Sequence, residues 1–135
     1  MTILEVAEKK WEQFCTRFEG ACRGAMMNIQ TLEPGGPART VAQNVPLLRV
    51  SLDNKTHPCN TTLVIEAGQP GRSQVTHVIV EPIHIRLENG HGGDRYHHLH
   101  IIAENGVTVI EVHPGMNRGL LDGLELTHRH PADRH

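Results

Sequence analysis

Apolar and polar residues alternate along two stretches on either side of Asn105-Gly106, within residues 96–113. Alternation with a period of two is typical of strands that bury one face, and Asn-Gly favours the positive φ angles of a two-residue hairpin turn. The pattern therefore predicts a β-hairpin with Asn105 and Gly106 as its turn. In that register His98 lies opposite His113, and His100 lies opposite Glu111.

The alternation also assigns a face to each side chain of the hairpin. The core-facing set is Leu99, Ile101, Ile110 and Val112, and the opposite set is His98, His100, Glu111 and His113. Side chains opposite each other on one face have Cβ atoms about 5 Å apart. The hairpin is thus expected to gather three imidazoles and one carboxylate in a single patch.

A helical pattern is expected to begin at the N-terminal end, where Thr2 and Glu5 have the spacing of a capping box. Apolar residues then recur at steps of three and four, at Leu4, Ala7, Trp11, Phe14, Cys15 and Phe18. This stripe predicts an amphipathic helix that ends near Gly20 and covers one face of a sheet.

Short β-like runs fill most of the remaining chain, separated by turn residues. The runs are residues 26–32, 40–45, 47–53, 61–67, 74–80 and 83–88, followed by the hairpin. Strands at such short intervals favour an antiparallel meander. We expect an α+β, mostly β fold, in which the helix packs on about seven or eight strands that form a small barrel or sandwich.

The chain is expected to form one domain over residues 1–126. Leu120, Leu121, Leu124 and Leu126 are expected to pack back on it, as an irregular segment or a short helix. Residues 127–135 form a polar, histidine-rich tail that is expected to fray.

Charge and composition narrow the classes of function. Thirteen basic and fifteen acidic residues give a net charge of -2, which argues against a strong electrostatic grip on nucleic acid. The three cysteines show no C-x-x-C spacing. No apolar run reaches the length of a membrane span, and the acidic residues near the N-terminus do not suit a signal peptide. A cytoplasmic location without membrane association is therefore expected.

His98 and His100 can reach one ion, because residues two apart on a strand project from the same face. Together with His113 and Glu111 they would suit Zn²⁺, and also Ni²⁺, Cu²⁺ or Fe²⁺. Two other interpretations stay open: a solvated or subunit-facing strand surface, and a pH-sensitive interface that responds to protonation of the imidazoles.

Other catalytic patterns are incomplete. Ser51 and Ser73 lack the G-x-S-x-G context of a nucleophile elbow, and Cys59 lies near His57 only across a turn that contains proline. We therefore expect a non-enzymatic interaction or accessory module that binds a protein partner or a second copy of itself. The alternative is a metal-binding protein or small metalloenzyme that uses His98, His100, His113 and Glu111.

An ordered set of short motifs resembles a bacterial family of small proteins known as domain of unknown function 5335. The set comprises Trp11-x-x-Phe14-x-x-x-Phe18, Asn44-Val45-Pro46-Leu47, Val75-Thr76-His77-Val78-Ile79, Glu81-Pro82, Ile85-Arg86-Leu87-Glu88 and Asn105-Gly106. The resemblance spans residues 11–126 and implies a shared fold, but it supplies no activity. The histidines at positions 97, 98, 100 and 113 depart from the family pattern, so a metal site here would be particular to this protein or its near relatives.

Overall fold

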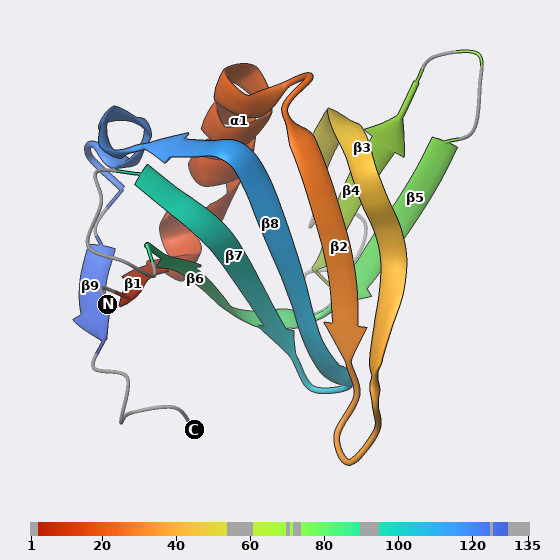
Figure 1. Ribbon diagram of the computed structural model, residues 1–135. Helices are drawn as coiled ribbons and strands as arrows, with labels where there is room; N and C mark the ends of the chain where they lie inside the picture. The colour runs from red at the N-terminus through yellow and green to blue at the C-terminus, as the bar shows by residue number, and fades with distance from the viewer. Residues whose placement is uncertain are drawn as a thin grey trace.

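A computed structural model describes residues 3–53, 61–69, 71, 74–89, 95–124 and 126–129, which form a strongly curved antiparallel sheet and one α-helix (Figure 1). The strands are β1 (Ile3–Val6), β2 (Met26–Leu32), β3 (Ala38–Asp53), β4 (Thr62–Gly68), β5 (Gln74–Val80), β6 (Pro82–Glu88), β7 (Arg95–Ala103), β8 (Gly106–Asn117) and β9 (Leu126–Arg129). Their order in the sheet is β5-β4-β3-β2-β8-β7-β6-β1-β9.

The long strand β3 bends the sheet. Its first part pairs with β2 and its last part pairs with β4, so one strand belongs to both halves of the sheet. Asn44 takes a φ of 54° close to the register shifts, and Pro46 still pairs with Met26. Bulges of this kind bend a strand without ending it. The two strands predicted for residues 40–45 and 47–53 are therefore one continuous strand.

The sheet does not close into a barrel. Within the described residues β5 pairs only with β4 and β9 pairs only with β1, so a strand edge stays open at each end. The predicted mostly β fold with an N-terminal helix is confirmed, and the open, folded sheet corresponds to the sandwich rather than the barrel.

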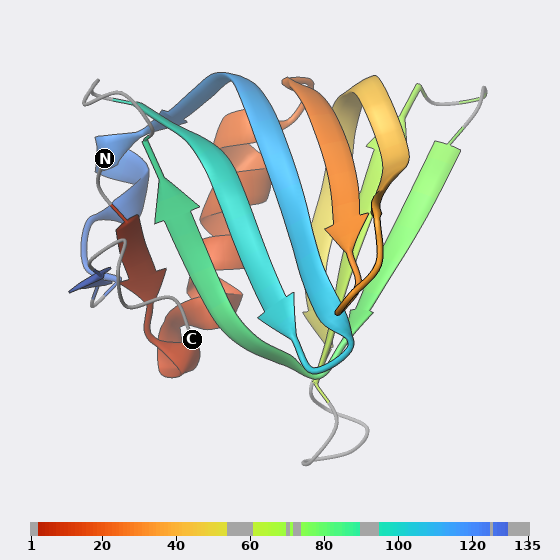
Figure 2. The ribbon, with the colours of Figure 1, turned by 60° about the horizontal axis from the view of Figure 1, so that its bottom comes forward.

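The helix α1 (Trp11–Cys22) follows a short 3-10 helix (Glu8–Lys10) and packs inside the curve of the sheet (Figure 2). Its buried side chains are Trp11, Phe14, Cys15, Phe18 and Cys22, which confirms the predicted apolar stripe from Trp11 onward, but not its first members, Leu4 and Ala7. Gly20 lies within the helix rather than at its end. Gly24, with a φ of 85°, directs the chain into β2 instead.

The predicted helix start is wrong, because residues 3–6 form β1. This strand pairs with β6 on one side and with β9 on the other, and it buries Ile3, Leu4 and Val6. Ladder bonds along both edges satisfy more backbone groups than a frayed first helical turn would. The predicted cap, Thr2, lies outside the described residues.

The leucine-rich segment near the C-terminus packs back as predicted. Leu120, Leu121 and Leu124 are buried, and Arg17 of α1 donates hydrogen bonds to the carbonyl oxygens of Leu120 and Asp122. This packing brings β9 alongside β1, so residues 127–129 pair within the sheet. Residues 130–135 lie outside the described residues. No helix in the described part of the chain is long and apolar enough to cross a bilayer.

Candidate functional site

The β7–β8 hairpin turns one residue earlier than predicted. Ala103 pairs with Gly106, so Glu104 and Asn105 form the turn, and neither has a positive φ. Gly106 takes a φ of 147°, and a Cβ at this position would lie 2.5 Å from the carbonyl oxygen of Leu32. Glycine is therefore needed where the hairpin meets the β2–β3 turn, and not within the turn itself.

The corrected register changes the pairs but not the faces. His98 lies opposite Glu111, and His100 lies opposite Val109, so the predicted pairs His98–His113 and His100–Glu111 are wrong. Because each partner moves by two residues, every side chain keeps its face. Leu99, Ile101, Ile110 and Val112 are buried as predicted, whereas His98, His100 and Glu111 are partly buried and His113 is exposed.

Glu111 is the centre of a polar cluster on the outer face. Nδ2 of Asn28 donates to Oε1 of Glu111 at 2.9 Å, and Nε2 of His113 lies 3.2 Å from the same oxygen. Nε2 of His98 lies 3.4 Å from Oε2 of Glu111. The backbone N–H of Asn44 donates to Oδ1 of Asn28 at 2.7 Å, which fixes the orientation of the Asn28 amide.

The cluster stabilises the ionised carboxylate. Hydrogen bonds from Asn28 and then from His113 lower the pKa of Glu111, and the charges of His113 and His98 add to this effect, while burial opposes it. Asn28, His98 and Glu111 also line a hollow of about 260 Å³. The hollow leaves the carboxylate accessible from solvent.

His100 belongs to a different contact on the same face. Its Nε2 lies 3.2 Å from Oε2 of Glu88 on β6. Farther along β6, Nδ1 of His84 lies 2.8 Å from Glu5, and Nε of Arg86 donates to Glu5 at 3.0 Å. The outer face therefore consists of separate imidazole–carboxylate contacts.

The structure brings together three of the four predicted metal ligands, His98, Glu111 and His113, and directs His100 to Glu88. The imidazole nitrogens point at the carboxylate oxygens rather than at a shared point. Across the described ranges, no group of three or more His, Cys, Asp or Glu side chains is arranged to hold a metal ion. The zinc site stays a prediction.

The described cysteines are poor nucleophiles. Burial, with a smaller contribution from the charge of Glu12, raises the pKa of the Cys15 thiol to about 12. Burial alone raises the pKa of the Cys22 thiol to about 11. Both thiols stay protonated near neutral pH. Cys59, His57 and Ser73 lie outside the described residues.

A polar contact inside the sheet was not predicted from the sequence. Nε2 of His77 on β5 lies 3.0 Å from Oγ1 of Thr108 on β8, and burial lowers the pKa of His77. The sequence contained a signal for it, because His77 shares a face with Val75 and Ile79, and Thr108 shares a face with Ile110. A polar residue at a core-facing position of a strand is unusual and often functional.

Replacing Asn28 with alanine is expected to raise the pKa of Glu111 toward its ordinary value, because the largest cause of the lowering is removed. A lowered pKa adds stability above the unfolded-state value, roughly 4.3, and this stability is lost as the pH falls through the folded-state pKa. The variant should therefore lose less stability on acidification than the wild type.

Carbon-detected NMR of the Glu111 carboxyl group measures this pKa. The matched control is His84→Ala, because His84 contacts Glu5 and should leave Glu111 unchanged. An unchanged Glu111 pKa in Asn28→Ala would contradict the arrangement of the cluster.

Comparisons of the chain with protein-family models, with curated proteins and with solved structures found no match.

Proposed function

We propose that the protein is a non-enzymatic interaction module that pairs with a second copy of itself through the open edge of β5. The main support for this proposal is the amino-acid composition of β5. Its sequence, Gln-Val-Thr-His-Val-Ile-Val, contains no charged residue and no proline. It pairs with β4 over all seven residues without a register shift. Natural edge strands commonly carry lysine, proline or a bulge that blocks further pairing, and β5 has none of these.

Apolar exposure supports the same surface. Val78 and Val80 of β5 are 50% and 54% exposed, and Ile83, just beyond the connection to β6, is 49% exposed. Exposed apolar side chains close to an unpaired strand edge are typical of interaction sites. Burying these side chains would stabilise the pairing of an additional strand with β5.

We infer that the partner strand at this edge is β5 of a second copy of the chain. Two β5 strands related by a two-fold axis would pair antiparallel, each presenting the same surface to the other. Because the strand carries no formal charge with His77 neutral, the two copies would meet no like-charge repulsion. The result would be one sheet that runs through both protomers.

Replacing Val78 with lysine is expected to weaken self-association by roughly tenfold or more, because two cations would face each other near the axis. Sedimentation velocity over a wide range of protein concentration measures this. The wild type should show a sedimentation coefficient that rises with concentration, and Val78→Lys should not.

The matched control is Met26→Lys, which places a lysine at another exposed apolar residue, 39% exposed, away from β5. It should associate as the wild type does. A wild type that is monomeric throughout would overturn the proposal, as would equal loss of association in both variants.

Metal binding by His98, Glu111 and His113 is the second candidate function. The observation that favours it is the approach of two Nε2 atoms to opposite oxygens of one carboxylate, at 3.4 and 3.2 Å. Two imidazoles and a carboxylate are ligands that Zn²⁺ accepts, and water would supply the fourth position.

Elemental analysis after equilibration with zinc and dialysis tests this candidate. The double variant His98→Ala/His113→Ala should retain less zinc than the wild type. The control His84→Ala/His100→Ala removes two histidines of the same face that contact other carboxylates, and should retain zinc. Equal zinc in all three proteins would exclude the site.

We also propose a cytoplasmic location and membership of the family known as domain of unknown function 5335. The free thiols of Cys15 and Cys22 support a reducing compartment, and the ordered motifs between Trp11 and Leu126 support the family.

A further inference from the structure

Polar side chains gather on the inner face of the sheet at one end. Thr31 of β2 pairs directly with Thr108 of β8, and His77 of β5 contacts Thr108 from across the fold. Farther along the same strands, the inner-face residues are apolar: Ile29 of β2 and Ile110 of β8 are fully buried. The polar end is the one at which the β2–β3 and β7–β8 turns lie (Figure 1).

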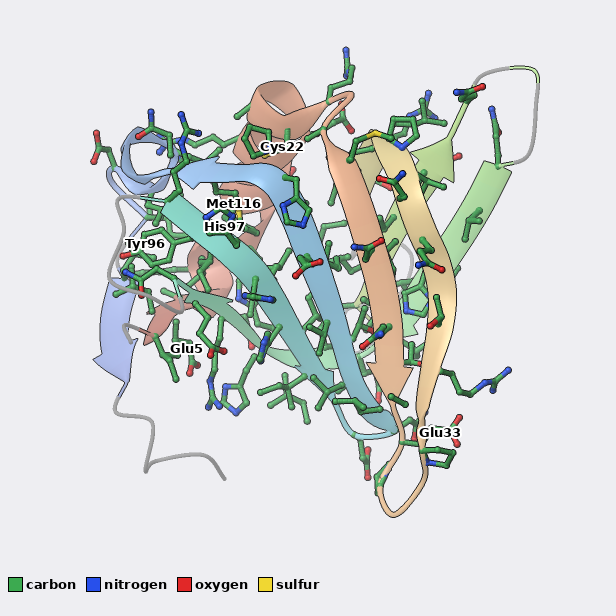
Figure 3. All side chains as sticks on the ribbon, viewed as in Figure 1. Glu5, Cys22, Glu33, Tyr96, His97 and Met116 are labelled. Atoms are coloured by element: carbon green, nitrogen blue, oxygen red, sulfur yellow. The ribbon has the colours of Figure 1, made fainter. Side chains whose placement is uncertain are left out.

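A pocket of about 490 Å³ lies at this end. Its walls combine the polar side chains of Thr31, His77 and Thr108 with apolar side chains. The apolar side chains include Val41, Ile79 and Val107. Figure 3 shows Glu33 at the β2–β3 turn and Cys22 at the opposite end of the sheet, near the C-terminal end of α1. The helix therefore fills one end of the interior, and the pocket occupies the other. Pockets of this size at the mouth of a curved sheet commonly take small molecules.

The polar groups in the interior of the pocket are uncharged near neutral pH, and the charged groups lie at its rim. Burial lowers the pKa of His77, which keeps its ring neutral, and Thr31 and Thr108 carry hydroxyl groups. At the rim, the opposite charges of Arg39 and Glu33 lie 3.9 Å apart on largely exposed side chains. A charged ligand would lose its hydration here without gaining a buried counter-charge.

The His77 ring has further capacity for hydrogen bonding. One ring nitrogen contacts Thr108, and the described residues supply no hydrogen-bond partner for the other. A neutral imidazole donates from one nitrogen and accepts at the other, and a hydroxyl group does both. His77 and Thr108 together can thus satisfy a hydroxyl or carbonyl group of a ligand in either orientation.

We propose that this pocket binds a small uncharged molecule that has an apolar body and one hydroxyl or carbonyl group. The apolar body packs against Val41, Ile79 and Val107. The polar group forms hydrogen bonds with His77 and Thr108. The pocket adjoins the surface proposed for self-association, since Val78 and Val80 also line it. Its hydrogen bonds come from the side chains of His77 and Thr108 and not from the backbone edge of β5.

Titration with 1-octanol, followed by two-dimensional amide NMR of the full chain, tests the proposal. The perturbed amides should be those of the pocket walls around His77 and Thr108. Octanoate, which has the same body but a negative charge, should bind at least tenfold more weakly, because its carboxylate would be desolvated without a partner. Octanoate binding as tight as that of octanol would overturn the assignment to a neutral ligand.

Thr108→Val keeps the shape of the side chain and removes its hydroxyl group. It should weaken octanol binding about fivefold, the value of one ordinary hydrogen bond. The matched control, Thr76→Val, makes the same change at an exposed position on β5 and should bind as the wild type does.

A second variant, Val41→Trp, fills the pocket and should abolish binding. Amide spectra of each variant without ligand establish that the fold is kept. Octanol binding that is absent in the wild type, that perturbs amides elsewhere, or that is equally strong in Val41→Trp would overturn the proposal. The titrations are run at a protein concentration at which sedimentation shows one species, so a failure of octanol binding can be told from a failure of self-association.

Discussion

Phe18→Ala is expected to destabilise the protein by about 4 kcal/mol, because it truncates a fully buried aromatic side chain of the helix. Phe18 is fully buried on the face of α1 that packs against the sheet. Its ring stacks on that of Phe14, with centroids 5.8 Å apart. Alanine would remove this contact and leave a cavity that the rigid sheet cannot fill, so both the transfer free energy and the packing energy are lost.

Urea denaturation followed by circular dichroism measures this change in the free energy of unfolding. The control is Gln13→Ala, which truncates an exposed side chain of the same helix and should change stability by less than about 0.5 kcal/mol. A loss below roughly 1 kcal/mol for Phe18→Ala would mean that the helix does not pack on the sheet as described.

Gly106→Ala is expected to cost about 3 kcal/mol, from two causes that act together. The added Cβ would lie 2.5 Å from the carbonyl oxygen of Leu32, and this obstacle is backbone rather than a movable side chain. The φ of 147° is also unfavourable for any residue with a Cβ. The β7–β8 hairpin would therefore have to separate from the β2–β3 turn.

Gly20→Ala is the matched control. Gly20 lies inside α1, and no heavy atom comes within 4 Å of an added Cβ. Alanine should stabilise the helix there by about 0.5–1 kcal/mol. The midpoints of urea denaturation should thus move in opposite directions for the two variants. A neutral Gly106→Ala would contradict both the positive φ of Gly106 and its close approach to Leu32.

Local patterns of sequence predicted much of the fold. Strands β2 and β5 have the bounds that alternation predicted, and the buried face of α1 follows the predicted stripe. In each case the signal lies within one element, since burial of one face determines which residues are apolar. The alternation of side chains along a strand also assigned His98 and Glu111 to the outer face correctly.

Contacts between distant segments could not be predicted in the same way. The spacing of Thr2 and Glu5 predicts a capped helix start, and only pairing with β6 and β9 makes residues 3–6 a strand. The hairpin register depended on the approach of Leu32 to Gly106. The contact of His100 with Glu88 depended on β6 and β7 being neighbours. Each of these outcomes follows from tertiary packing, which a local pattern does not contain.

Amide hydrogen exchange in β5 at low and high protein concentration tests the proposed self-association most directly. Alternate residues of this strand direct their N–H groups away from β4. Pairing with a second copy would hydrogen-bond these groups and slow their exchange. We expect slower exchange of these amides at high concentration in the wild type and no change in Val78→Lys. Exchange rates in β5 that are the same at every wild-type concentration would contradict the proposal.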